Sequence, residues 1–144
     1  VRSSVLLFDQ APFGNVHKTG LDKPGMVYVP ASCASGAQCK LHISLHGGHE
    51  PWVFEYELVQ GSKSHGLSIN RWAETNNMVV LWPKVGSQAD YFKLRENNWD
   101  SYGETGNDFD TKTGVQMVAI RRMIETIAGI QMEDVLDSSQ AAAD

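Results

Sequence analysis

The sequence predicts an α/β domain, and three consecutive segments carry that prediction. Residues 41–45 alternate between apolar and polar and residues 78–82 are a continuous apolar run, both of which are typical of strands, and residues 68–76 between them have the spacing of a helix. The order strand, helix, strand is typical of a parallel sheet covered by helices. With 144 residues the chain has the length of one domain, so we expect residues 1–144 to form a single unit.

The N-terminal part predicts a lead-in and two strands. Residues 1–20 are mixed and turn-rich, and we expect them to run over the surface. Residues 26–30 are β-branched and aromatic and stop at a proline, which predicts the first strand. Residues 41–45 alternate and end at His46 and two glycines, where the backbone must turn. We expect these two strands to pair with each other.

The predicted helix at residues 68–76 presents Trp72 and Ala73 on one face. It stops at two asparagines, which suit a left-handed turn. The strand at 78–82 that follows is apolar on both faces, as in a parallel strand buried between helices. We expect three to four sheet strands in all.

A second helix is predicted over residues 113–128. Thr113 and Gln116 have the spacing of a capping box. Beyond them one apolar stripe follows the helical period: Met117, Ile120, Met123, Ile124 and Ile127. The preceding residues 83–110 form a long loop, which is uncommon unless functional. We expect the tail, residues 131–144, to be frayed.

Composition excludes several classes of function. Twelve Lys and Arg against 17 Asp and Glu give a net charge of −5, which offers no basic surface for a nucleic acid. No apolar run approaches the roughly 20 residues that cross a membrane. The N-terminus has neither an initiator Met nor the apolar stretch of a signal peptide, so we expect the chain to begin inside a longer precursor.

Cys33 and Cys39 are the only cysteines, and they flank a Ser/Gly-rich loop whose ends can meet. A disulfide there would close a ring of about seven residues and stabilise the fold by about 2 to 2.5 kcal/mol. Two separate thiols in a reducing compartment are the alternative, and spacing does not decide between them. We expect no metal site, because no second Cys/His pair follows, and no cofactor.

His46-Gly47-Gly48 is the most informative local feature. Backbone N–H groups of such glycines can converge on a developing negative charge, as in an oxyanion hole. A plain structural turn is the alternative. A strand before it and a helix and strand after it give the context of the first half of an α/β-hydrolase sheet. However, the chain has no Gly-x-Ser-x-Gly sequence and no readable Ser-His-Asp set, so the nucleophile is missing.

A second cluster, residues 97–103, combines aromatic rings with amide groups. Rings supply apolar contact area and amides fix orientation, so Asn98, Trp99 and Tyr102 are candidates for substrate binding. The alternative is that these rings plug the end of the sheet.

Several sequence strings together resemble the C-terminal half of extracellular poly(3-hydroxybutyrate) depolymerases, and in particular their circularly permuted group. The resemblance runs from about residue 6 to residue 128. It rests on these strings in this order: Leu6-Leu7-Phe8-Asp9-Gln10, Gly25-Met26-Val27-Tyr28-Val29-Pro30, Cys33 with Cys39, Leu41-His42-Ile43-Ser44-Leu45-His46-Gly47, Asn70-Arg71-Trp72-Ala73-Glu74-Thr75-Asn76, Leu81-Trp82-Pro83, Trp99-Asp100 and Lys112-Thr113-Gly114-Val115-Gln116-Met117.

The resemblance implies a partial α/β-hydrolase fold from a secreted serine esterase. It also implies that the catalytic triad precedes the matched region, which explains the missing nucleophile. Cys33 and Cys39 would form a disulfide, the Gly48 N–H would be the oxyanion donor, and Trp99 would contact the polyester.

Two positions depart from the family pattern, which has cysteines where this chain has Gly48 and Asn98. The two cysteines are missing together, which indicates that a bridge between the oxyanion turn and the substrate loop has been lost as a unit. The loop also has fewer rings than in the family, which puts binding of an insoluble polyester in doubt.

We therefore expect part of an extracellular esterase, inactive alone, whose partners are an ester or polyester substrate and a missing N-terminal half of the catalytic domain. The alternative is a non-catalytic secreted binding module derived from the same fold.

Overall fold

The computed structural model describes residues 4–22, 24–47, 69–86 and 98–129. In chain order the elements are β1 (Ser4–Asp9), η1 (Ala11–Phe13), α1 (Val16–Thr19), β2 (Pro24–Val29), α2 (Ala31–Ala34), β3 (Lys40–Ile43), α4 (Ile69–Thr75), β4 (Met78–Trp82) and α5 (Val115–Ile127). The expected frayed tail at 131–144 lies outside the described residues.

The strands form one mixed sheet in the order β1-β2-β4-β3. Strands β1 and β2 are antiparallel, β2 and β4 are antiparallel, and β3 and β4 are parallel. All three predicted strands are confirmed, but the expected pairing of the first with the second is wrong because β4 lies between them. The middle of β4, residues 79–81, is buried, whereas Lys40 and His42 of β3 are exposed. The more apolar strand therefore takes the interior place and β3 takes the edge.

Residues 4–20, the described part of the expected lead-in, do more than run over the surface. Strand β1 lies along the whole of β2, from Ser4 opposite Val29 to Asp9 opposite Pro24. The sequence did not show this strand because turn-forming residues follow it closely.

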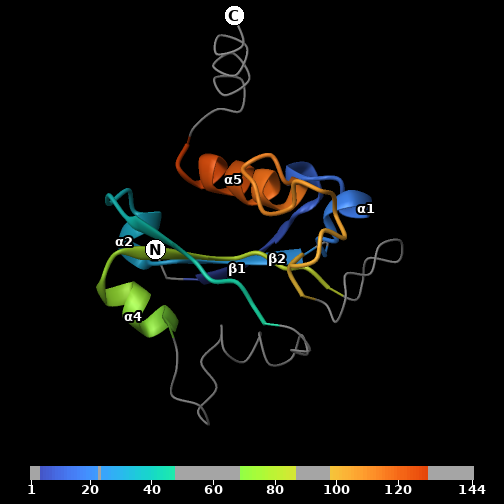
Figure 1. The fold of residues 1–144 in the computed structure, drawn as a ribbon. Helices are drawn as coiled ribbons and strands as arrows, with labels where there is room; N and C mark the ends of the chain where they lie inside the picture. The colour runs from blue at the N-terminus through green and yellow to red at the C-terminus, as the bar shows by residue number, and fades with distance from the viewer. Residues whose placement is uncertain (1–3, 23, 48–68, 87–97, 130–144) are drawn as a thin grey trace, which may run out of the picture.

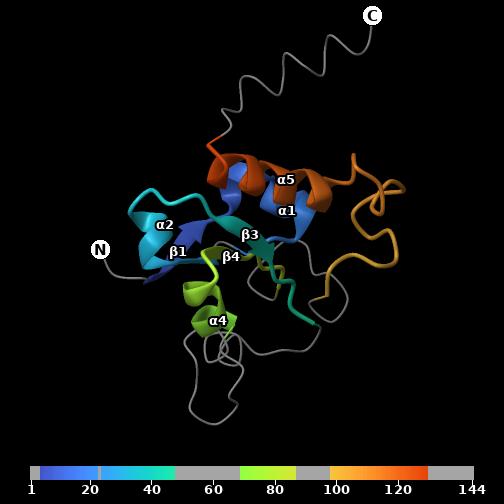
Figure 2. The same cartoon turned by 90° about the vertical axis from the view of Figure 1, so that its left-hand side faces the viewer.

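Helices cover both faces of the sheet (Figures 1 and 2). Helices α5 and α1 lie on one face and α4 lies on the other. The core on the α5 side contains Leu21, Leu81, Val85, Ala119 and Met123. The core on the α4 side contains Tyr28, Ala73 and Val80.

Helix α5 begins without the expected capping box. Gly114 takes the N-cap position with no side-chain hydrogen bond, and Gln116 points elsewhere. A Cβ at Gly114 would lie 2.6 Å from the Phe109 carbonyl oxygen, so only glycine fits there. The buried positions of the helix are Gln116, Ala119 and Met123, while Met117 is half-exposed. The predicted apolar stripe is therefore wrong at both ends, since Met117 and Ile127 are exposed and only Met123 in its middle is fully buried.

Helix α4 confirms the predicted helix, but only part of its predicted apolar face is buried. Ala73 is fully buried, whereas Trp72 is 66% exposed. The left-handed turn is confirmed one residue before β4, since Asn77 has a φ of 49°. The Cys33–Cys39 disulfide is also confirmed. Within the described ranges, no helix has the length and apolar character to cross a membrane.

Candidate functional site

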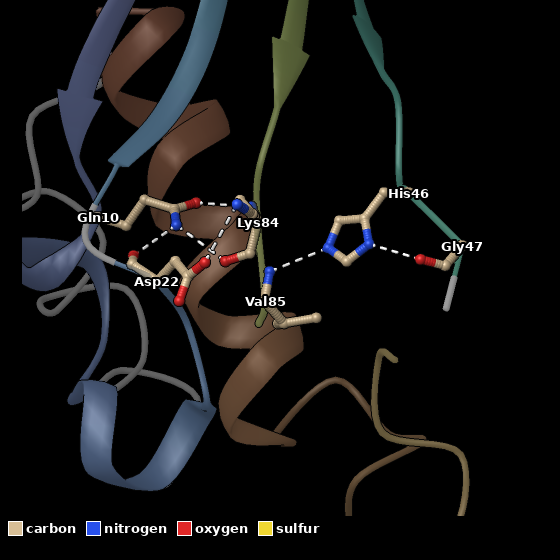
Figure 3. Close-up of polar contacts among 6 residues, drawn as sticks. All are labelled: Gln10, Asp22, His46, Gly47, Lys84 and Val85. Carbon is tan, nitrogen blue, oxygen red and sulfur yellow. Dashed lines mark hydrogen bonds and ion pairs between the residues drawn. The ribbon is translucent and has the colours of Figure 1, made fainter. Parts of the chain in front are cut away.

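The segment that follows β4, which includes Lys84 and Val85, is held by hydrogen bonds from two sides. On one side Gln10, fully buried, accepts the Lys84 N–H at 2.9 Å and donates to the Asp22 and Lys84 carbonyls at 2.7 and 2.9 Å. The Lys84 Nζ forms an ion pair with the Asp22 carboxylate at 3.3 Å, and that carboxylate side chain is only 1% exposed. The backbone beyond β4 is therefore fixed before it reaches Val85 (Figure 3).

On the other side His46 connects this segment to the end of β3. The Val85 N–H donates to His46 Nε2 at 3.1 Å, and His46 Nδ1 lies 2.8 Å from the Gly47 carbonyl oxygen. Figure 3 shows the imidazole between the two backbone segments, with one ring nitrogen facing each.

These two contacts define the tautomer of His46. A backbone N–H can only donate, so Nε2 must be the unprotonated, accepting nitrogen. Nδ1 then carries the proton and donates it to the Gly47 carbonyl. In this arrangement His46 is neutral and both ring nitrogens are used for holding backbone.

Trp99 lies against the same imidazole. The ring centroids of His46 and Trp99 are 5.7 Å apart and the planes are tilted by 45°. Trp99 also packs against the core on the α5 side. Its Nε1 is buried and has no hydrogen-bond partner among the described residues. The predicted oxyanion turn and the predicted substrate loop thus meet through two rings.

Asp100 organises the loop that follows Trp99. Its Oδ1 accepts the backbone N–H groups of Tyr102, Gly103 and Glu104 at 3.0, 2.8 and 3.0 Å. Its Oδ2 accepts both the N–H and the hydroxyl of Thr105 at 2.6 Å. Gly103 has a φ of 80°, which closes the turn around the carboxylate.

The charged form of Asp100 is strongly favoured. Partial burial alone would raise its pKa, but the hydroxyl and N–H of Thr105 and the N–H groups of Tyr102 and Glu104 outweigh burial and lower the pKa from 3.8 to about 2. A carboxylate with so many donors holds a loop in shape and is poorly suited to accept a proton from substrate.

Gln116 ties this loop to helix α5 and to the N-terminal segment. Its Oε1 accepts the Asp100 N–H at 3.0 Å, and its Nε2 donates to the Thr19 carbonyl at 2.8 Å. The residue that was expected to cap the helix therefore spans three segments instead.

The predicted site residues fall in different places. His46 and Gly47 end the β3 segment, and Gly48 lies outside the described residues. Asn98 is half-buried next to Trp99, and Tyr102 is 71% exposed.

Sequence reasoning missed the anchoring roles of Gln10, Asp100 and Gln116. Only Asp100 has a readable signal, since an Asp shortly before a Gly is typical of side-chain-stabilised turns.

The arrangement presents a backbone turn with a fixed carbonyl beside an aromatic ring. Within residues 4–22, 24–47, 69–86 and 98–129, no group of three His, Cys, Asp or Glu side chains could hold a metal ion.

Comparisons with known proteins agree with the resemblance read from the sequence. The chain is 35% identical over 133 residues to a polyhydroxybutyrate depolymerase of Talaromyces funiculosus, covering 86% of this chain and 38% of that protein. It is 34% identical over 123 residues to a poly(3-hydroxybutyrate) depolymerase of Delftia acidovorans, covering 84% of this chain and 23% of that one. No protein-family model matches the chain.

Solved structures give the same relationship. The crystal structure of PHB depolymerase from Penicillium funiculosum superposes with a TM-score of 0.70 at 32% identity, covering 91% of this chain and 42% of that one. A PHB depolymerase complexed with an R3HB trimer superposes with a TM-score of 0.66 at 33% identity, with the same coverage. The chain is therefore a relative of PHB depolymerases that spans less than half of their length, and it has a partial α/β fold.

Proposed function

We propose that this chain is the oxyanion-turn half of a serine ester hydrolase related to the PHB depolymerases. The observation that carries the proposal is the place of His46-Gly47 in the fold. These residues leave the end of β3 and begin the connection to α4. In α/β-hydrolases the loop at this place supplies one of the two backbone N–H groups of the oxyanion hole.

Each site residue has a role in this proposal. A serine that lies outside the 144 residues of this chain attacks the ester carbonyl. A histidine base from the same missing segment accepts the proton of that serine. The Gly48 N–H stabilises the negative oxygen of the tetrahedral intermediate, which then expels the alcohol and leaves an acyl-enzyme for water to hydrolyse. Trp99, with Asn98 and Tyr102, holds the acyl chain.

The outer edge of β3 is the place where that segment would join the sheet. The Lys40 and Ser44 N–H groups bond toward β4, so by the alternation of a strand the backbone groups of Leu41, Ile43 and Leu45 point the other way. Within the described residues β3 is an edge strand, and Leu45 is 52% exposed. A strand added in parallel here would end beside His46, where a nucleophile is needed.

The substrate we propose is a polyester or a short ester of a hydroxy acid. One of the related structures contains an R3HB trimer. In this chain Trp99 and Tyr102 are the rings of the substrate loop, and only Tyr102 is largely exposed. We therefore expect soluble oligomers to be better substrates than an insoluble polymer surface. We also propose an extracellular location, because the Cys33–Cys39 disulfide is typical of oxidising compartments.

The test compares three proteins in the hydrolysis of a p-nitrophenyl ester and of a 3-hydroxybutyrate oligomer. They are the 144-residue chain, the full-length protein that its gene encodes, and a hybrid in which these residues replace the matching part of the Talaromyces depolymerase. The proposal expects no turnover by the first and inhibitor-sensitive turnover by the other two.

If the full-length protein and the hybrid both fold but remain inactive, the proposal is overturned. The non-catalytic binding module would then take its place. Turnover by the 144-residue chain alone would show that it carries a nucleophile of its own. A Trp99→Ala variant of the active protein should raise KM for the oligomer more than KM for the p-nitrophenyl ester.

A further inference from the structure

We propose that the cavity between helix α5 and the N-terminal segment is a binding site for a short-chain monocarboxylate. The inference goes beyond the proposed function, because no step of ester hydrolysis uses this cavity. It stands or falls on binding alone.

The cavity lies on the face of the sheet where α5 packs against both η1 and α1 (Figures 1 and 2). It has a volume of about 230 Å³ and is partly open to solvent. Cavities that hold drug-sized ligands usually measure about 300 to 1,000 Å³. This one therefore has room for a smaller molecule, with a chain of only a few carbons.

Most of the lining is apolar, and it comes from Phe13, Val115 and Val118. The two valines are three residues apart on α5, so they lie on the same face of the helix. Phe13 is held by an edge-to-face contact with Phe8, with 5.9 Å between the ring centroids. The three lining side chains are only half-buried, so a short hydrocarbon chain in the cavity would remove further apolar surface from water.

Two cations complete the lining. Lys18 comes from α1 and is exposed, whereas Arg122 comes from α5 and is half-buried. The Arg122 Nη1 donates to the Phe13 carbonyl at 3.2 Å, which holds the guanidinium beside the cavity. Within the described part of the chain, neither cation forms an ion pair with a carboxylate, whereas the neighbouring Arg121 pairs with Glu125 at 3.4 Å.

These charges select a carboxylate as the ligand. The lining contains no Asp or Glu among the residues that the structure describes, and the Thr113 hydroxyl already donates to Asp108 at 2.9 Å. The donors left for a ligand are therefore Lys18 and the remaining N–H groups of the Arg122 fork, which matches the two oxygens of a carboxylate. A phosphate would present polar oxygens to the apolar wall. A carboxylate with a short apolar chain satisfies both the cations and the wall.

The experiment is a titration of the full-length protein with butyrate, followed by NMR of its valine methyl groups. We expect saturable shifts at Val115 and Val118, and none at Val80, which is buried in the core on the α4 side. A ligand of about six non-hydrogen atoms should bind with a Kd on the order of 1 mM. Butyramide has the same shape without the charge, so we expect it to bind at least about 10-fold more weakly.

Variants of the lining test where the ligand binds. Arg122→Met should weaken butyrate binding about 10-fold or more. Because it also removes the bond to the Phe13 carbonyl, Val118→Phe provides a second test that keeps both cations and fills the cavity. We expect Val118→Phe to abolish the butyrate shifts at Val115 while the protein stays folded. Arg121→Met, at the exposed neighbouring position outside the lining, should leave the affinity unchanged.

The opposite results overturn the inference. Equal binding of butyrate and butyramide would show that the charge is not recognised. Unchanged affinity in both Arg122→Met and Val118→Phe would place the ligand elsewhere, and sulfate binding more tightly than butyrate would show an unspecific anion site. None of these measurements depends on turnover, so an inactive protein that binds butyrate here would overturn only the proposed function.

Discussion

Gln116 and Asp100 are joined by a hydrogen bond between helix α5 and the loop that follows Trp99. The Gln116 Oε1 accepts the Asp100 N–H at 3.0 Å, while its Nε2 donates to the Thr19 carbonyl at 2.8 Å. One buried amide therefore holds the proposed substrate loop against both the helix and the N-terminal segment.

The first prediction concerns this amide. Gln116→Met keeps the volume but leaves the Asp100 N–H and the Thr19 carbonyl without partners, so we expect a loss of about 1 to 3 kcal/mol in the free energy of unfolding. Urea unfolding measures it. Met117→Ala, at the exposed neighbouring position of the same helix, should change stability by less than about 0.5 kcal/mol. Equal effects at the two positions would contradict the anchoring role of Gln116.

A second prediction follows from the lowered pKa of Asp100. Its pKa is about 2 in the folded chain and 3.8 ordinarily, so the folded state binds this proton less readily than the unfolded state. The stabilisation is complete above about pH 4 and is lost as the pH falls through about 2. Unfolding measured across this interval should therefore be less pH-dependent in Asp100→Asn than in the wild type. Asp110→Asn, an exposed carboxylate of the same loop, controls for the loss of one charge.

The third prediction concerns the disulfide. Removing it by the double substitution Cys33→Ala and Cys39→Ala should lower the free energy of unfolding by about 2 to 2.5 kcal/mol, since the closed ring has only about seven residues. Denaturation curves with and without dithiothreitol measure the effect. The reductant should shift the wild-type curve toward that of the double variant and leave the double variant unchanged. An unshifted wild type would contradict the prediction.

The fourth prediction concerns the ion pair between Asp22 and Lys84. The carboxylate is nearly inaccessible, and the Lys84 side chain is 12% exposed. Lys84→Met removes this cation from beside a buried carboxylate, so we expect a loss of about 3 to 5 kcal/mol. The double variant Lys84→Met with Asp22→Asn should recover part of this loss, because the buried carboxylate is then replaced by a neutral amide. Thermal unfolding of the wild type, the two single variants Lys84→Met and Asp22→Asn and the double variant checks this, and additive losses would argue against direct pairing.

The sequence predicted the strands and helices that depend on local patterns. Strand β4 is apolar on both faces, and the Asn77 turn has a residue type suited to a positive φ, so neighbouring residues alone determine both. The pairing of strands depends on which strand is the most apolar. For that reason the expected contact between residues 26–30 and 41–45 was wrong.

The anchoring of the candidate site was much less predictable. Gln116 has the right spacing for a capping box, and only the approach of Asp100 and Thr19 from distant segments shows its other use. Likewise His46 stood out as part of a glycine turn, whereas its bond to the Val85 N–H depends on the parallel pairing of β3 with β4. Contacts between residues far apart in the sequence produce no periodic pattern of residue types, so the sequence alone does not predict them.

The position of β4 between β2 and β3 has a consequence for the order of folding. Strands β2 and β3 are joined by residues 30–39, which include the disulfide, yet a full strand separates them and they lie about 10 Å apart. Strand β4 arrives only after the long connection of residues 44–77 and must enter this gap. Closing such a connection is slow. We therefore expect β1 and β2 to form early as a hairpin, and the end of β3 that carries His46 to be among the last parts of the molecule to reach its final place.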